Sequence, residues 1–209
     1  MRPETINRPR QKYKRRRLAL ALLFVIAGAA HAQEATWHLV FEPAFMRPDF
    51  AFPIAGTKET VLTPALARGE DVTDLKKADV ARLKLDVDSI RRLATASASA
   101  ELAKLKPQFV RDKKGVAVFA LLASDSPTTA SAVLAPEFAD QFANTLGPDL
   151  LVAIPNRYKI YVYPALASHF QETAHLVLND YEASGYPVSK EVFRVTPKGL
   201  QAIGEFKIP

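Results

Sequence analysis

The sequence predicts an α+β fold, in which three or four helices pack on a mostly antiparallel sheet and form a single domain after a signal peptide. Segments with the apolar spacing of helices are interspersed with short segments rich in β-branched and aromatic residues. Turn sequences short enough for hairpins join several strand segments, and no regular strand–helix–strand alternation is present. Removing the first 32 of the 209 residues leaves 177, an ordinary length for one domain.

The N-terminus predicts export through a cleavable signal peptide at residues 1–32. Eight Lys and Arg side chains and one acidic residue precede an uncharged stretch of 13 residues, Leu18–Ala30. This stretch is shorter than the roughly 18 to 20 apolar residues that span a bilayer. Small residues at Ala30 and Ala32 suit signal peptidase, so we expect cleavage between Ala32 and Gln33 and a periplasmic or secreted mature protein.

The mature chain differs in net charge from the whole chain. The whole chain carries 28 Lys and Arg and 22 Asp and Glu, a net charge of +6. Without residues 1–32, 20 basic and 21 acidic side chains remain, a net charge of −1. A nearly neutral protein lacks the basic surface that binds nucleic acids, so no nucleic-acid partner is expected. The absence of cysteine excludes disulfides, thiol catalysis and iron–sulfur clusters.

Residues 33–69 are predicted to form an extended arm with one strand, at 37–41, ahead of a globular α+β domain at 70–209. Prolines as frequent as those of the arm exclude a long helix. The aromatic side chains of the arm pack either on their own domain, which is the commoner arrangement, or on a partner. The prolines are Pro43, Pro48, Pro53 and Pro64, and the aromatic residues are Phe41, Phe45, Phe50 and Phe52.

The segment 73–105 has helical periodicity. A break near Leu85 is expected, because Asp86 or Asp88 is suited to cap a second helix there. Apolar residues three and four apart predict one shared buried face. These residues are Val80, Leu83, Val87, Ile90 and Ala94.

Two further helices and a set of strands complete the predicted domain. The helices are expected at about 136–146 and 166–183, each followed by a glycine. The residues Leu150–Ile154 are all apolar, which predicts a central strand buried on both faces. The alternating segment 158–163 predicts a half-buried partner strand. The remaining strands are expected at 108–111, 116–122, 192–195 and 200–206.

No catalytic or metal-binding pattern is present in the mature sequence. Its three histidines, His38, His169 and His175, have no spacing that would let two of them hold one ion, so neither a metal nor another cofactor is expected. No serine lies in a nucleophile-elbow or Ser-x-x-Lys pattern, and the scattered glycines form no phosphate-binding loop.

The turn after the predicted central strand holds the candidate binding residues, Asn156, Arg157 and Tyr158. A guanidinium at the end of a sheet can bind a carboxylate or a phosphate through two hydrogen bonds. The alternative, which we favour from the sequence, is an ordinary Pro-Asn turn whose Arg157 is solvated or paired with a local acid such as Asp149.

The block that contains Ser131-Ala132-Val133-Leu134, Pro136-Glu137-Phe138 and 150–157 and continues to Tyr163 resembles an uncharacterised bacterial YtpQ-like family. The resemblance covers about 80 residues, at roughly 131–206. It implies a helix, a buried strand ending in Pro-Asn/Ser-Arg-Asp, a second strand and another helix. This chain has Tyr158 where the family usually has Asp, which removes the acid of an Arg-Asp pair. The resemblance implies no activity.

We therefore expect a non-enzymatic periplasmic or secreted binding or interaction protein, with an unknown protein or small molecule as its partner. One alternative is a cofactor-free hydrolase whose site is assembled from distant residues. The other is a component of the membrane surface that retains its N-terminal segment. The first suspects for the hydrolase are Ser168, His169, His175, Arg157 and Asp180.

Overall fold

The computed structural model describes residues 35–166 and 170–207. The predicted signal peptide and its Ala32–Gln33 junction lie outside the described residues, as do Ser168 and His169. The residues from Ala35 onward form one compact unit. Within the described ranges, no helix is both long enough and apolar enough to span a membrane.

The predicted α+β class is confirmed, with two antiparallel sheets among the described residues in place of one. In the first sheet, β3 pairs with β1 along one edge and with β2 and β4 along the other. Its strands are β1 (Thr36–Pro43), β2 (Phe52–Pro53), β3 (Thr60–Arg68) and β4 (Asp71–Asp74).

The second sheet has the strand order β10-β9-β7-β8-β6-β5. Its strands are β5 (Gln108–Arg111), β6 (Ala117–Ala123), β7 (Leu150–Asn156), β8 (Lys159–Pro164), β9 (Glu191–Thr196) and β10 (Gly199–Glu205). Every residue of β7 is buried, and β7 lies between β8 and β9 inside the sheet. The predicted central strand is therefore confirmed.

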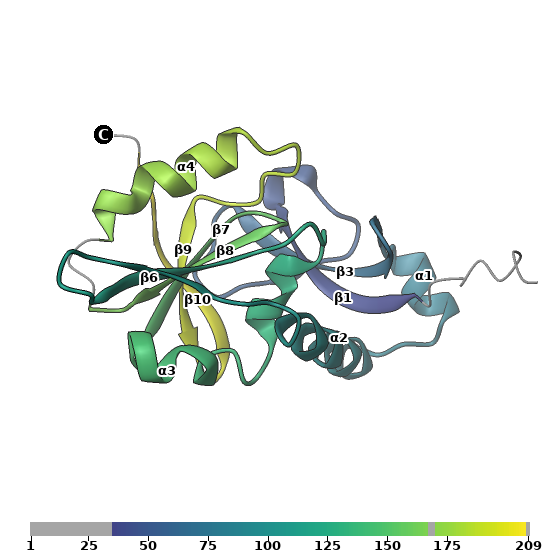
Figure 1. The fold of residues 1–209 in the computed structure, drawn as a ribbon. Coiled ribbons are helices and arrows are strands. Elements are labelled where there is room, and N and C mark those ends of the chain that lie inside the picture. The colour runs from purple at the N-terminus through teal and green to yellow at the C-terminus, as the bar shows by residue number, and fades with distance from the viewer. Residues whose placement is uncertain (1–34, 167–169, 208–209) are drawn as a thin grey trace, which may run out of the picture. The chain divides into compact units, whose positions relative to one another are not determined.

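Helices cover both faces of the second sheet (Figure 1). On one face, Phe138, Phe142 and Leu146 join the buried cluster that contains Val152. On the other face, Val177 of α4 packs in a cluster with Tyr161 and Tyr163 of β8. The helices are α1 (Lys77–Arg82), α2 (Val87–Leu102), α3 (Asp140–Leu146) and α4 (Ala174–Glu182), and the 3-10 helices are η1 (Ala44–Met46), η2 (Thr129–Leu134) and η3 (Gln171–Thr173).

This double cover corrects the prediction for β8. Because α4 packs on the face that was expected to be exposed, Tyr161 and Tyr163 are 5% and 0% exposed. The strand is buried on both sides rather than half-buried.

The predicted break in the segment 73–105 is confirmed, whereas its single buried face is wrong. Asp86 caps α2, since its carboxylate accepts a 2.6 Å hydrogen bond from the amide of Ser89. Between α1 and α2 the chain turns through Lys84, which has a φ of 52°. The turn separates the two helical faces, so Leu83 and Val87 are exposed while Ile90 and Ala94 remain buried.

The two later helices are shorter than predicted. The α-helix α3 begins at Asp140 rather than near 136, because the preceding chain forms the 3-10 helix η2 and a turn. The helix α4 begins at Ala174, and Leu166, predicted to face inward, is 97% exposed.

The described part of the predicted arm, residues 35–69, holds three strands rather than one, and it continues through the β3–β4 hairpin into the same compact unit. Pro64 lies within β3, yet it interrupts no pairing. Its carbonyl accepts a hydrogen bond from Leu75, so its nitrogen also points away from β1, toward the gap between β2 and β4. A proline at this position therefore costs no ladder hydrogen bond.

Candidate functional site

The candidate site begins with a polar face on the first sheet. In an antiparallel sheet, paired residues point to the same side and alternate residues share a face. His38 of β1 and Asp74 of β4 both pair with Ala65 of β3, and two and four residues after His38 the same face carries Val40 and Glu42. Thr63 pairs with Val40 and belongs to this face as well.

Arg157 contacts this face from the turn between β7 and β8. Its Nε donates a 3.1 Å hydrogen bond to Oε1 of Glu42, and its Nη2 donates to the same oxygen. The side chains of Arg157 and Glu42 are 15% and 10% exposed. The expectation of a solvated arginine, or of one paired with Asp149, is therefore wrong. The partner comes from a strand that is distant in sequence and that passes beside the turn.

Arg157 does not fully offset the effect of burial on the carboxylates beside it. Burial raises the pKa of the Glu42 carboxyl above its ordinary value, although Arg157 acts to lower this pKa. Asp74 is more exposed, and its partial burial also raises its pKa, against the lowering effect of Arg157. One guanidinium therefore lies near two carboxylates.

One tyrosine ring lies over the arginine, and a second tyrosine ring contacts the first. The Cζ atom of Arg157 is 5.4 Å from the centroid of the Tyr186 ring, and the rings of Tyr186 and Tyr158 are 6.2 Å apart at an interplanar angle of 66°. Tyr186 is 55% exposed. The arginine is thus held by Glu42 on one side and stacked under an exposed ring on the other.

The structure brings all three sequence-predicted residues to this place. Nδ2 of Asn156 donates a 3.0 Å hydrogen bond to the backbone carbonyl of Asp180, and its Oδ1 accepts one from the amide of Tyr158. Asn156 is buried and anchors the turn, while Arg157 and Tyr158 present their side chains to the site. Asn156 is therefore a positioning residue.

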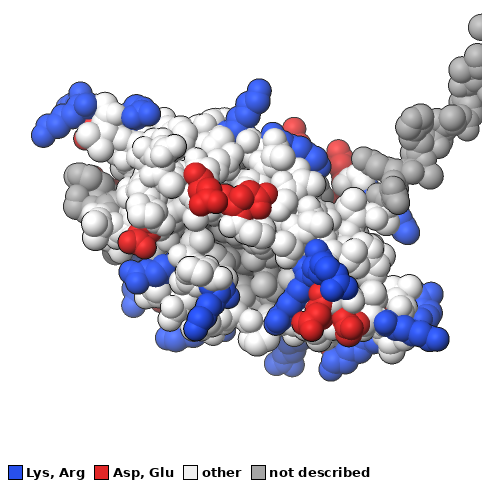
Figure 2. Space-filling model, turned by 90° about the horizontal axis from the view of Figure 1, so that it is seen from below, with Lys and Arg blue, Asp and Glu red and all other residues white. Residues whose placement is uncertain are grey.

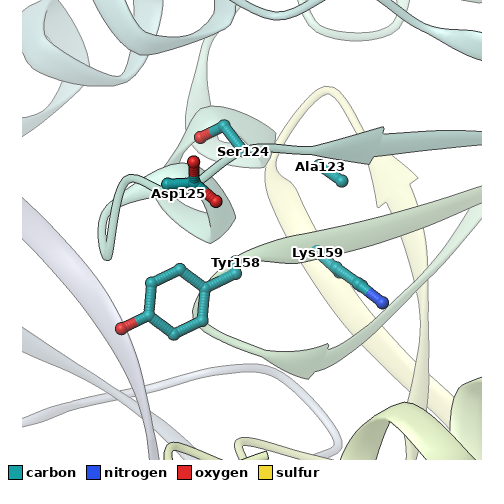
Figure 3. A pocket seen from close by; sticks show the side chains of 5 residues that line it. All are labelled: Ala123, Ser124, Asp125, Tyr158 and Lys159. Atoms are coloured by element: carbon teal, nitrogen blue, oxygen red, sulfur yellow. The ribbon is translucent and has the colours of Figure 1, made fainter.

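A hollow of about 490 Å³ lies beside Tyr158, where β6 ends and β8 begins (Figure 3). In Figure 3 the carboxylate of Asp125 and the ring of Tyr158 lie on the same side of the hollow, and the side chain of Lys159 points away from that ring. The ammonium of Lys159 is 2.6 Å from Oδ1 of Asp180. The residues lining the hollow are Ala123, Ser124, Asp125, Tyr158 and Lys159.

His38 is the buried histidine of the polar face, and it is 5% exposed. Its Nε2 lies 2.9 Å from Oγ1 of Thr36, whereas its Nδ1 has no hydrogen-bond partner among the described residues. The same holds for Oγ1 of Thr63, which is 0% exposed. Burial lowers the pKa of His38, with smaller contributions from Glu101, which raises it, and from Lys104, which lowers it.

Sequence reasoning missed Glu42, Asp74 and Tyr186. Glu42 follows the apolar run of β1, and a period of two already places it on one face with His38. This pattern could have identified a polar face within a buried strand. The pairing of that face with Arg157 depends on tertiary structure and leaves no local signal.

The residues suspected for a hydrolase do not converge where the structure describes them. Both carboxylate oxygens of Asp180 are engaged, by Lys159 at 2.6 Å and by the hydroxyl of Tyr161 at 2.6 Å. His175 is exposed, and its Nδ1 lies 2.9 Å from the carbonyl of Glu172. In the described ranges, no group of three or more acidic or histidine side chains is placed to hold a metal ion.

Comparisons with known proteins return no match: none among protein-family models, none among curated proteins and none among solved structures. The functional argument therefore rests on the residues of this chain.

Proposed function

We propose that the chain is an exported, non-enzymatic binding protein whose ligand or partner contacts the surface formed by Arg157, Tyr158 and Tyr186. The observation that carries the proposal is the exposed ring of Tyr186 stacked on a guanidinium that Glu42 holds in place. Exposed aromatic rings and anchored arginines are enriched where proteins bind their partners.

Preorganisation supports this assignment. Arg157 is fixed by Glu42, and the turn before it is fixed by the hydrogen bond from Asn156 to the backbone of Asp180. A side chain that is already ordered loses little conformational freedom when a ligand binds, so less of the interaction energy is lost to ordering. The adjoining hollow adds concave surface beside the rings.

The expected charge of the mature chain supports a partner other than a nucleic acid. That charge is −1, and the face drawn in Figure 2 shows basic side chains spread mostly around its edge and acidic side chains in small groups. A nearly neutral protein lacks the strong excess of positive charge that attracts a polyanion.

Export is part of the proposal, and it is tested by processing. Expressed from the full-length chain in a bacterial host, the protein is expected in the periplasm or the medium, with Gln33 as its first residue. Cell fractionation and intact mass measure both properties. A protein that keeps Met1 and sediments with membranes would support the membrane-surface alternative instead.

Binding is tested by a thermal-shift screen of small molecules against the purified protein. A ligand of the folded state raises the melting temperature by mass action. We expect hits whose shift is lost in Tyr186→Leu and kept in Trp37→Leu, because Trp37 is a partly exposed aromatic residue on the opposite face of β1. Hits that survive Tyr186→Leu unchanged would place the binding site elsewhere.

Kinship with the YtpQ-like family stays a prediction. It rests on the order of elements around 131–163 and on the Pro-Asn-Arg turn. An alignment of homologues in which Asp recurs at the position of Tyr158 would support it.

A further inference from the structure

The charges around the two tyrosine rings are predominantly negative. Arg157 lies near the carboxylates of Glu42 and Asp74. The second cation of the site, Lys159, already forms an ion pair with Asp180 at 2.6 Å. Apart from the Lys159–Asp180 pair, the carboxylates of Glu42 and Asp74 therefore lie near a single cation, the guanidinium of Arg157.

Asp125 adds a third carboxylate. It is exposed, and among the described residues it makes no hydrogen bond or ion pair. It lines the hollow together with Tyr158, and Figure 3 shows its carboxylate on the side of that ring, with the Lys159 side chain directed elsewhere. The charge of Asp125 is therefore available to a ligand in the hollow.

The aromatic rings connect this hollow to the polar face. Tyr158 lines the hollow, its ring contacts Tyr186, and Tyr186 covers Arg157. The face of a tyrosine ring attracts cations through its quadrupole, and the attraction strengthens where water is partly excluded. Thr63, fully buried on the face shared with Glu42, leaves an unpartnered hydroxyl among the described residues.

An anionic ligand fits the site less well. One donor on Nε and one on Nη2 of Arg157 are already engaged by Glu42, so only its remaining donors are left for an anion. A second anion would also face Asp74 and Asp125.

We propose that the site binds a small organic cation, either a protonated primary amine or a quaternary ammonium compound. Its charged group would lie between the Tyr158 ring and the carboxylate of Asp125. This inference rests on the proposed binding function and gives that function a ligand class. The hollow, of about 490 Å³, has room for a small ligand and is largely open to solvent.

The test compares choline with 3,3-dimethyl-1-butanol, which has nearly the same shape and no charge, and with acetate. Each probe is titrated into the protein purified from the full-length chain, and amide chemical shifts are followed by NMR. Choline is expected to shift the signals of Asp125, Tyr158 and Tyr186, and the neutral isostere is expected to bind at least about threefold more weakly.

Variants locate the site. Asp125→Asn and Tyr158→Leu are expected to weaken choline binding by about threefold to tenfold. Asp88→Asn removes the same charge from an exposed position on α2 and serves as the matched control, with an unchanged affinity expected.

The outcomes separate the ligand class from the binding function. If the alcohol or acetate shifts the same amides as strongly as choline, the cation inference is overturned while the binding site stands. If no probe shifts these amides, the cation inference is also overturned, and the thermal-shift screen alone then decides whether the site binds anything. Equal weakening by Asp88→Asn and Asp125→Asn would reduce the effect to overall charge and contradict the site.

Discussion

Arg157 and Glu42 lie 115 positions apart in the chain, and two donors of the arginine converge on one oxygen of the glutamate. The pair links the turn of the second sheet to the last part of β1 in the first sheet. Because both side chains are mostly buried, removing either one would leave the other as a poorly solvated, unpaired charge.

Arg157→Ala is expected to lower the free energy of unfolding by about 3 kcal/mol, since it leaves the buried Glu42 carboxylate unpaired. An exposed, solvated arginine would contribute less than about 1 kcal/mol. Urea denaturation of wild type and variant measures the difference. A loss below 1 kcal/mol would show that the contact does not persist in solution.

The double variant Arg157→Ala with Glu42→Gln is the control for this prediction. Glu42→Gln removes the orphaned charge, so the double variant is expected to be more stable than Arg157→Ala alone. Two additive single effects would mean that the side chains do not interact.

Val152→Asp is expected to abolish soluble folding. Val152 is 0% exposed in the interior strand β7, and an unpaired buried carboxylate costs several kcal/mol against a total stability of roughly 5 to 15. The soluble fraction on expression and the far-UV circular dichroism spectrum measure the effect. Val110→Asp, at a 43% exposed position of β5, is the matched control and is expected to fold.

The parts of the fold that follow from short-range pattern could be predicted from the sequence. Five consecutive apolar residues identified β7, and a carboxylate at position 86 or 88 indicated the start of α2, which the structure places after Asp86. Both signals depend on residues within a few positions of each other. A strand buried on both faces and a capped helix start can therefore each be predicted from a few neighbouring residues.

The first sheet and the candidate site required long-range pairing. The sequence predicted no strand at Pro64, and the gap between β2 and β4 is what makes a proline acceptable in β3. Arg157 was a candidate from the sequence, yet its partner Glu42 could not be selected among the 22 acidic residues of the chain. A period of two fixes which face a residue occupies, whereas it does not fix what covers that face.

Gly56→Ala is expected to cost more than Gly115→Ala, although both glycines have a positive φ, of 77° and 81°. A Cβ at position 56 would lie 2.6 Å from the carbonyl oxygen of Ala202 in β10, whereas a Cβ at position 115 would meet nothing within 4 Å. We expect about 1 kcal/mol for Gly115→Ala and more than about 2 kcal/mol for Gly56→Ala. Thermal unfolding of both variants measures the costs, and equal costs would show that β10 moves freely away.

His38 is expected to make the fold less stable as the pH falls below 6.5. Burial lowers its pKa from the ordinary value of 6.5, so the unfolded chain takes up a proton there that the folded chain refuses. The stabilisation is therefore complete above pH 6.5 and is lost as the pH falls toward the pKa of the folded state. Glu101 and Lys104 face the imidazole with opposite charges, so their effects on its pKa partly cancel.

The acids of the polar face act in the opposite direction, and the experiment has to separate the two effects. The raised pKa values of Glu42 and Asp74 give a stabilisation that is present at low pH and is lost as the pH rises through them. His38→Gln keeps a polar group that can donate to or accept from Thr36, and it removes the titration of the imidazole. Denaturation midpoints measured from pH 5 to pH 8 are expected to fall toward low pH more steeply in wild type than in His38→Gln. Parallel curves would show that the imidazole titrates as it does in the unfolded chain, and that folding does not lower its pKa.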